Sequence, residues 1–268
     1  MRVDVGSILG VAIGTSAILL GNLLEGGHLA ALLQPTALLI VVGGTVGATM
    51  LGFPLPVFAR AVRALRDVFS QQPHQDNRAL IEEIVEYAQK ARRDGIIALE
   101  QPLEQAQEPF LKKALLLAVD GADSKTMRDN LELIIEHYED DKEQLAKVWE
   151  SAGGYAPTIG IIGAVLGLIH VMQSLSDVSA VGKGIAVAFV ATIYGVSMAN
   201  LLLLPVAAKL KLKLREEIKR LELMMEGALA IQEGMNPSLI REKLSSFSVE
   251  ERSKSEVGSV SQRAEART

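Results

Sequence analysis

The sequence predicts an all-α integral membrane protein, with four transmembrane helices and a helical cytoplasmic domain between spans two and three. The first observation is four apolar stretches without any Asp, Glu, Lys or Arg. A helix rises about 1.5 Å per residue, so about 20 apolar residues cross a bilayer core of roughly 30 Å. The second observation is the charged blocks that follow each pair of stretches. The stretches cover residues 5–24, 35–59, 151–176 and 184–208, and the blocks cover 60–150 and 209–268.

Glycines at helical spacing predict that the spans pack closely. The first span carries Gly6, Gly10 and Gly14, which form two overlapping G-x-x-x-G motifs that allow another helix to approach. Glycine is also common in membrane helices generally, which is the alternative explanation. Small residues in two further spans favour tight packing or an oligomer: Gly43, Gly44, Gly47, Ala48 and Gly52 in span two, and Gly160, Gly163 and Gly167 in span three.

The block 60–150 has the apolar periodicity of helices. Gly95 is placed to end a first helix, and Asp123 with Ser124 is placed to begin a long second one. No strand pattern separates this second helix from span three, so we expect it to continue into the membrane. The apolar face of the first helix consists of Leu80, Ile81, Ile84, Val85 and Ala88.

The tail is expected to begin as an amphipathic helix over residues 210–231. A short helix can follow Asn236 and Pro237, which completes a segment over residues 209–244. Residues 245–268 are rich in serine and charge, and are expected to be disordered.

The distribution of Lys and Arg predicts the orientation. Of 27 such residues, thirteen lie in the block 60–150 and twelve in the tail, whereas residues 25–35 contain none. Short loops rich in Lys and Arg stay on the cytoplasmic side. Both blocks and both termini are therefore expected to be cytoplasmic, in a multi-pass protein of the bacterial inner membrane.

Composition argues against several classes of function. The chain has no cysteine and four scattered histidines, so we expect no disulfide, no metal site and no cofactor. It has no G-x-x-x-x-G-K-[ST] loop and no Ser-His-Asp signature, so we do not expect an enzyme. The net charge of −5 argues against a nucleic-acid partner. The N-terminus carries one Arg and lacks a clear cleavage site, which favours a retained first span over a signal peptide.

The spans contain almost nothing that titrates. His170 is the exception near neutral pH, and an interfacial polar residue explains it well. Proteins that carry ions usually keep a few carboxylates within the membrane. Either this chain conducts no ions, or a partner supplies the carboxylate.

A few other residues are candidates for function, each with a plain structural alternative. Pro157 and Pro205 loosen a helix, or they are a first-turn proline and a helix stop respectively. The Thr192 hydroxyl faces a water-filled ion path, or it donates a hydrogen bond to a carbonyl oxygen of its own helix. Arg92 and Glu100, which flank Gly95, are alternatively a solvated charge pattern.

Several segments together resemble the MotA/PomA family of flagellar stator proteins. The match covers nearly the whole chain in order, up to about Leu244. Five segments carry the match: residues 4–10, 91–100, 155–169, 186–195 together with Pro205, and 227–237. The third of them begins with Tyr-Ala-Pro-Thr-Ile-Gly.

The resemblance implies a ring of five copies around a dimer of a single-span MotB/PomB-type partner. That partner would carry the ion-accepting aspartate and the peptidoglycan anchor, and ion flow would turn the ring against the rotor. Arg92 and Glu100 match the family's charged pair that engages the rotor protein FliG. Pro157 and Pro205 match its two functional prolines near the ion path.

The resemblance also bears on the coupling ion. Sodium-type relatives have threonine where this chain has Ala164 and Ala191, with a further threonine matching Thr192. Sodium needs several oxygens to replace its hydration shell, whereas a proton needs an acceptor and a hydrogen-bonded path. The two alanines favour protons over sodium.

The function expected is therefore a flagellar stator A subunit that converts ion-motive force into torque. The boundaries expected are 1–59 for spans one and two, 60–150 for the rotor-interacting domain and 151–208 for spans three and four. The nearest rival is an energiser of the ExbB/TolQ type, which has three spans and the opposite N-terminal orientation. A passive helical scaffold is a rival from another class.

Overall fold

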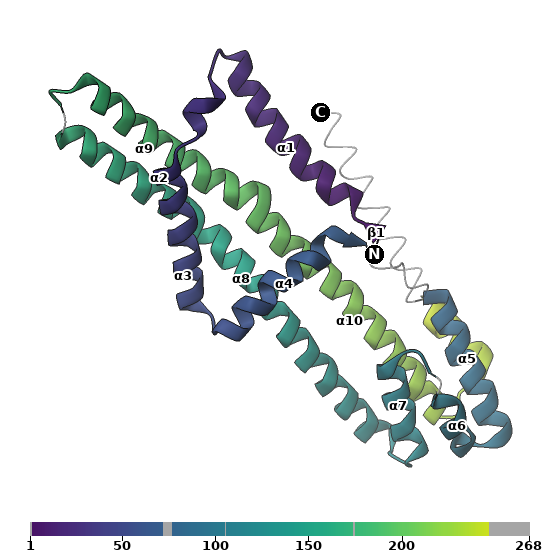
Figure 1. Ribbon diagram of the computed structural model, residues 1–268. Helices are drawn as coiled ribbons and strands as arrows, with labels where there is room; N and C mark the ends of the chain where they lie inside the picture. Colours follow the sequence, from purple (N-terminus) through teal and green to yellow (C-terminus); the bar gives the residue numbers. More distant parts are fainter. Residues whose placement is uncertain (1, 72–76, 105, 174, 247–268) are drawn as a thin grey trace. The chain divides into compact units, whose positions relative to one another are not determined.

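The computed structural model describes residues 2–71, 77–104, 106–173 and 175–246, and this part of the chain is almost entirely helical (Figure 1). Its strands are β1 (Arg2–Val3) and β2 (Ser70–Gln71), which pair antiparallel. Most of the expected tail 245–268 lies outside the described residues, although residues 245 and 246 end a helix that begins at 237. The short helix expected after Asn236 is thereby confirmed.

Four helices in the described residues are long and apolar enough to cross a membrane. The first is α1 (Val5–Leu24), which has the predicted bounds. After η1 (Leu29–Leu32), the second is continuous through α2 (Pro35–Leu38), the π-helical η2 (Leu39–Gly43) and α3 (Gly44–Gly52).

The second span is shorter than the apolar stretch 35–59. It ends at Gly52, and α4 (Leu55–Phe69) begins as a separate helix after Pro54. Pro54 and Pro56 lack the amide hydrogens that a continuing helix needs, and proline biases the preceding residue towards extended backbone, as at Phe53. The helix of span two therefore ends before the expected boundary at Ala59, because two prolines interrupt a stretch that hydropathy alone would continue.

The third and fourth spans are parts of much longer helices. The helix α8 (Ser124–Gln173) is 50 residues long, which confirms that a helix of the middle block continues into span three. The fourth runs through α9 (Val178–Met198), the π-helical η4 (Ala199–Leu203) and α10 (Leu204–Gln232). The amphipathic tail helix is thus a continuation of span four.

The chain divides into two compact units. The first comprises residues 1–73 and 141–214. Its buried side chains form small clusters between helices, such as Ala37, Val41, Val190 and Ala191. Trp149 donates a hydrogen bond to the Ala61 carbonyl oxygen over 3.0 Å, which ties α4 to α8.

The second unit comprises residues 74–140 and 215–268. Its further helices are α5 (Asn77–Asp94), η3 (Ile96–Leu99), α6 (Glu100–Leu103) and α7 (Pro109–Val119). The five apolar residues predicted on α5 are all buried, as are six large apolar side chains from other elements of this unit: Leu99, Leu111, Met127, Leu131, Leu229 and Ile240.

Both predicted helix boundaries in this unit are confirmed. Gly95 follows the end of α5 with φ of 85°, a conformation that glycine adopts without steric cost. Asp123 caps α8, because its carboxylate accepts bonds from the amides of Lys125 and Thr126 at 3.1 and 3.0 Å.

Candidate functional site

The helices α8 and α9 touch along glycines. A Cβ atom on Gly160 would lie 2.9 Å from the Ala191 carbonyl oxygen, and one on Gly167 would lie 2.7 Å from the Gly184 carbonyl oxygen. A Cβ on Gly195 would lie 2.5 Å from the Ala156 carbonyl oxygen. Backbone therefore meets backbone, as the glycine spacing of span three predicted, and the matching stripe of span four was not noticed in the sequence.

This contact places the residues proposed for ion selectivity. Ala191 is fully buried against Gly163 and the second span, and Thr192 is half-buried beside it. The Thr192 hydroxyl donates to the Ala188 carbonyl oxygen over 3.2 Å, the back-bonded arrangement that is usual for helical threonine. Ala164 is half-buried on α8, next to Gly163.

Pro157 lies in the interior of α8, not in its first turn, so the first-turn alternative is wrong. Its ring nitrogen has no hydrogen to donate to the Gly153 carbonyl oxygen. Gly153 is buried, and a Cβ atom there would lie 2.5 Å from Leu204 Cδ2. The turn that Pro157 weakens therefore packs against the residue before Pro205.

Pro205 is not a helix stop, because the helix continues through it to Gln232. The π-helical η4 immediately precedes it. Such segments change the hydrogen-bonding pattern locally and recur at functional sites. The structure thus places both prolines at neighbouring weakened turns of α8 and α10, a proximity that the sequence could not show.

A cavity of about 310 Å³ lies beside Pro205, between α1, the end of α4 and span four. Ser7 and Gly10 of α1 line it, as do Asn200 and Lys209. Lys209 donates to the Asp4 carboxylate and to the Ser7 hydroxyl, and the Asp4 carboxylate also accepts from the Ser7 amide at 3.1 Å. Sequence reasoning missed this group, although Asp4 before an apolar helix has the pattern of an N-cap.

Two buried threonines in span two were also missed. The Thr49 hydroxyl donates to the Thr45 carbonyl oxygen over 2.7 Å, whereas the Thr45 hydroxyl has no partner among the described residues. Both line an apolar cavity of about 150 Å³ with Trp149 and Met198. Their spacing of four residues, which places them on one face of a helix, is the sequence pattern that could have identified them.

Arg92 and Glu100 lie in the second unit, at the two ends of the Gly95 connection. Arg92 is in the last turn of α5, and Glu100 is the first residue of α6. Both are exposed, and neither forms an ion pair with the residues that the structure describes. Exposed, unpaired charges suit contact with another molecule.

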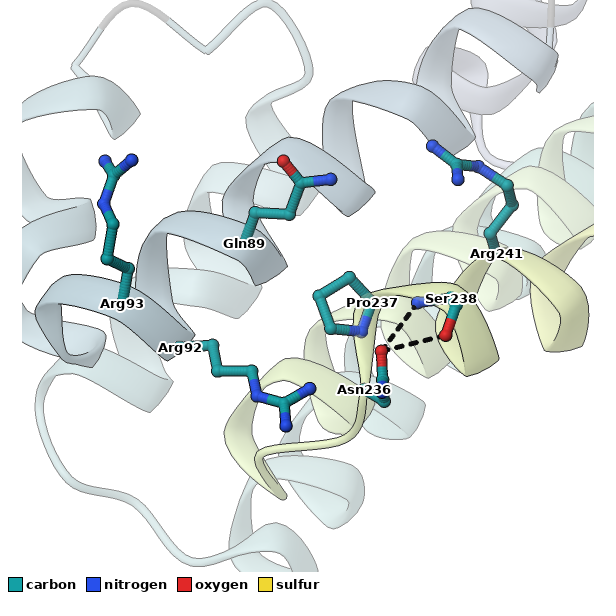
Figure 2. Close-up of a pocket in the computed structure, with 7 residues that line it drawn as sticks. All are labelled: Gln89, Arg92, Arg93, Asn236, Pro237, Ser238 and Arg241. Atoms are coloured by element: carbon teal, nitrogen blue, oxygen red, sulfur yellow. Dashed lines mark hydrogen bonds between the residues drawn. The ribbon is translucent and has the colours of Figure 1, made fainter.

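Arg92 also lines an open cleft of about 470 Å³ (Figure 2). The cleft lies between α5 and the turn that leads to helix 237–246. Its lining holds three arginines and no carboxylate: Gln89, Arg92, Arg93, Asn236, Pro237, Ser238 and Arg241. Figure 2 shows the Arg92 side chain extending towards Asn236.

The other two arginines of this cleft have carboxylate partners. Arg93 pairs with Asp94 at 2.9 Å, and Arg241 pairs with Glu82 at 2.6 Å. A hydrogen bond from Arg241 lowers the pKa of Glu82, and one from Arg93 lowers the pKa of Asp94. Arg92 thus carries the uncompensated charge.

No group of three or more potential metal ligands occurs among the described residues, and His170 is exposed on α8.

Comparisons with known proteins give the family. A model of the MotA/TolQ/ExbB proton channel family matches residues 103–223, and a model of the motility protein A N-terminal region matches residues 8–95. Motility protein A of Bacillus subtilis is 36% identical over 241 residues, which cover 90% of this chain and 89% of that protein. This chain belongs to the motility protein A family. Chemotaxis protein PomA of Vibrio alginolyticus is 32% identical over 91% of this chain and 95% of its own.

Solved structures of family members have the same fold. The match to the C. jejuni MotAB structure has a TM-score of 0.84 at 31% identity and covers 91% of this chain and 95% of that chain. The match to the flagellar MotAB stator complex of Bacillus subtilis has a TM-score of 0.83 at 36% identity, covering 90% and 94%. With its four apolar helices, this family member is a multi-pass membrane protein.

Proposed function

We propose that this chain is the A subunit of a flagellar stator, which uses ion-motive force to produce torque on the rotor. The observation that carries this proposal is the end-to-end match to the stator complex of Bacillus subtilis, at 36% identity and a TM-score of 0.83. A match over 90% of the chain includes both the spans and the helices between them.

The partner in this proposal is a MotB-type subunit with one span. A MotB-type partner is supported by the solved relatives, which are MotAB complexes. That subunit supplies the ion-accepting carboxylate. Spans without Asp or Glu, and close glycine contacts between α8 and α9, support this division of labour. Five copies of the chain surround two copies of the partner in the inner membrane, with both termini and the block 60–150 in the cytoplasm.

Protons are the coupling ion in this proposal. Ala164 and Ala191 offer no hydroxyl, so a sodium ion would find no side-chain ligand at these two positions. The Thr192 hydroxyl donates to the Ala188 carbonyl oxygen and keeps its lone pairs, so it is the single side-chain oxygen among the three positions. One proton crossing a potential of 100 mV releases about 2.3 kcal/mol, which is several RT.

The two prolines couple ion transfer to movement. Helix α8, weakened at Pro157, and helix α10, weakened at Pro205, can bend at neighbouring turns that already contact each other through Gly153 and Leu204. The bend would carry along the rest of α8 and α10. Arg92 and Glu100 would then engage opposite charges on the rotor protein FliG. Exposed charges of this kind raise the association rate and fix the alignment of the two proteins more than they raise the affinity.

The test is rotation of tethered cells in a host that lacks its own stator and has a compatible rotor. The chain is expressed with its B-type partner in sodium-free buffer. Rotation that a protonophore abolishes is the expected result. Rotation that requires sodium would overturn the proton assignment alone. Absence of rotation in both conditions, with both subunits in the membrane, would contradict the stator function.

A further inference from the structure

The apolar cavity of about 150 Å³ beside span two has a buried floor and an exposed mouth. The mouth consists of Val42 and Val46 of span two and Val62 of α4, whose side chains are all exposed. The cavity therefore opens between span two and α4, within the first unit. The buried residues of its floor come from span two, α8 and η4: Thr45, Thr49, Val148, Ala152 and Leu203.

Neighbouring charges fix the depth of this cavity relative to the membrane. Glu150 is the last charged residue before span three, and it pairs with Lys211, just after span four, at 2.6 Å. Trp149, which lies beside Glu150 in sequence, lines the cavity. Tryptophan is enriched where hydrocarbon meets the lipid headgroups. The cavity thus extends from the headgroup boundary at Trp149 into the apolar level of Val42 and Met198.

The helix α4 brings positive charge to the same boundary. Arg63 and Arg66 are exposed, and neither has a carboxylate partner among the residues that the structure describes. Val62 of the mouth and Arg66 are four residues apart, so they lie on one side of the helix. An apolar face flanked by arginines is typical of a helix that lies in the membrane interface. The opposite face of α4 is buried, with Ala61, Ala64 and Val68.

These features together specify the occupant of the cavity. An apolar cavity of this size stays dry and takes up hydrocarbon. An apolar side chain of another protein could fill it, but would leave the two arginines at its mouth unpaired. An anionic phospholipid supplies both groups at the right depths, with its acyl chain in the apolar layer and its phosphate at the boundary.

We infer that this cavity holds an acyl chain of an anionic phospholipid, whose phosphate pairs with Arg66 and Arg63. The lipid belongs to the leaflet on the α4 side, which is the cytoplasmic leaflet in the orientation proposed above. It packs between span two, α4 and α8, and it is a ligand of the membrane unit that torque generation does not itself require.

Trp149 reports on the occupant directly, because it is the only tryptophan of the chain. The complex is purified with a B-type partner whose tryptophans are replaced by phenylalanine. It is then reconstituted in phosphatidylcholine vesicles that contain increasing fractions of one lipid with brominated acyl chains, because bromine quenches tryptophan fluorescence on contact. Brominated phosphatidylglycerol should quench at a mole fraction about five- to twentyfold lower than brominated phosphatidylcholine does, as expected for two basic side chains near the phosphate.

Variants of the mouth and of the arginines should affect different properties. Val62→Phe fills the mouth from α4 and should reduce quenching by both lipids, and Val46→Phe fills it from span two with the same result. Arg63→Gln and Arg66→Gln should each lower the preference for phosphatidylglycerol by about two- to fivefold. Quenching by brominated phosphatidylcholine should persist in these two variants.

Matched controls lie outside the cavity. Val5→Phe enlarges an exposed apolar residue of α1, and Arg215→Gln removes an exposed charge from α10. Neither residue lines the cavity, so both variants should be quenched as the unmodified complex is.

Three results would overturn the inference. Absence of quenching by either lipid would show that protein covers the cavity, either a second copy of this chain or the partner. Equal quenching by the two lipids would show that the site does not select an anionic headgroup. If Val62→Phe and Val46→Phe are both quenched like Val5→Phe, Trp149 meets lipid outside the cavity. None of these results bears on the stator function, which is judged by rotation.

Discussion

Asp4 and Lys209 form an ion pair across 205 positions of sequence. Asp4 is the N-cap of α1, and Lys209 lies four residues after Pro205. The two side chains retain 18% and 26% of their exposure, so the pair is largely withdrawn from solvent. The hydrogen bond from Lys209, with that from the Ser7 amide, lowers the pKa of Asp4. The pair fixes the first turn of α1 to the segment that follows the weakened turn at Pro205.

Asp4→Asn should separate the two roles of this carboxylate. Asparagine also caps helices well, so α1 should still start at Val5, while the charge-assisted bond to Lys209 is lost and the melting temperature should fall. Thermal unfolding of the purified complex measures the loss. Lys209→Met should cost a similar amount, and the double variant should cost less than the sum. Additive losses would show that the two residues act independently.

Close contact between α8 and α9 should make Gly195 intolerant of even one methyl group. Gly195→Ala would place Cβ 2.5 Å from the Ala156 carbonyl oxygen, and this overpacking should cost about 1–3 kcal/mol. The melting temperature of the complex in detergent checks it. Gly182→Ala on the same helix is the control, since a Cβ atom there has nothing within 4 Å. Equal melting temperatures for both variants would refute the contact.

Replacing Pro157 should strengthen the helix and weaken the motor. Alanine restores the amide that can bond to the Gly153 carbonyl oxygen, so α8 should lose its weak turn and unfold no more easily. Rotation speed at unchanged protein level should fall. Pro109→Ala, at the N1 position of α7, changes a proline that weakens no turn and should rotate normally. Normal swimming with Pro157→Ala would remove its proposed role.

The Glu82–Arg241 pair predicts a weak acid dependence for helix 237–246. Because Arg241 lowers the pKa of Glu82 in the folded chain, the pair stabilises this helix above the usual glutamate pKa of 4.5, and that contribution is lost as pH falls through the lowered value. Hydrogen-exchange protection of residues 237–246, corrected for intrinsic rates, should decrease over that acidic range. Glu82→Gln should remove this dependence. An identical pH profile in the two proteins would show that the ion pair has no role.

Burial on α5 also gives Tyr87 a pKa raised to about 12, with a contribution from its bond to Glu83 at 3.0 Å. The phenol therefore stays neutral over the whole range in which Glu82 titrates, and tyrosine ionisation cannot account for a change in the protection of helix 237–246.

The sequence by itself determined the number of spans, the bounds of α1, the buried face of α5 and the caps at Asp123 and Gly95. These features depend on hydropathy, periodicity and local backbone chemistry, all of which act within about one helical turn or one bilayer thickness. It also supplied the family, through motifs distributed along the chain.

Tertiary structure decided what lies beside what. The contact of Gly153 with Leu204, the Asp4–Lys209 pair and the cleft joining Arg92 to the Asn236 turn each unite residues from helices distant in sequence. Hydropathy also placed the end of span two too late, at Ala59, and left Pro157 and Pro205 open to readings as helix ends. Periodicity describes one helix at a time, whereas these relationships depend on how helices pack and on which polar groups find partners once they are buried.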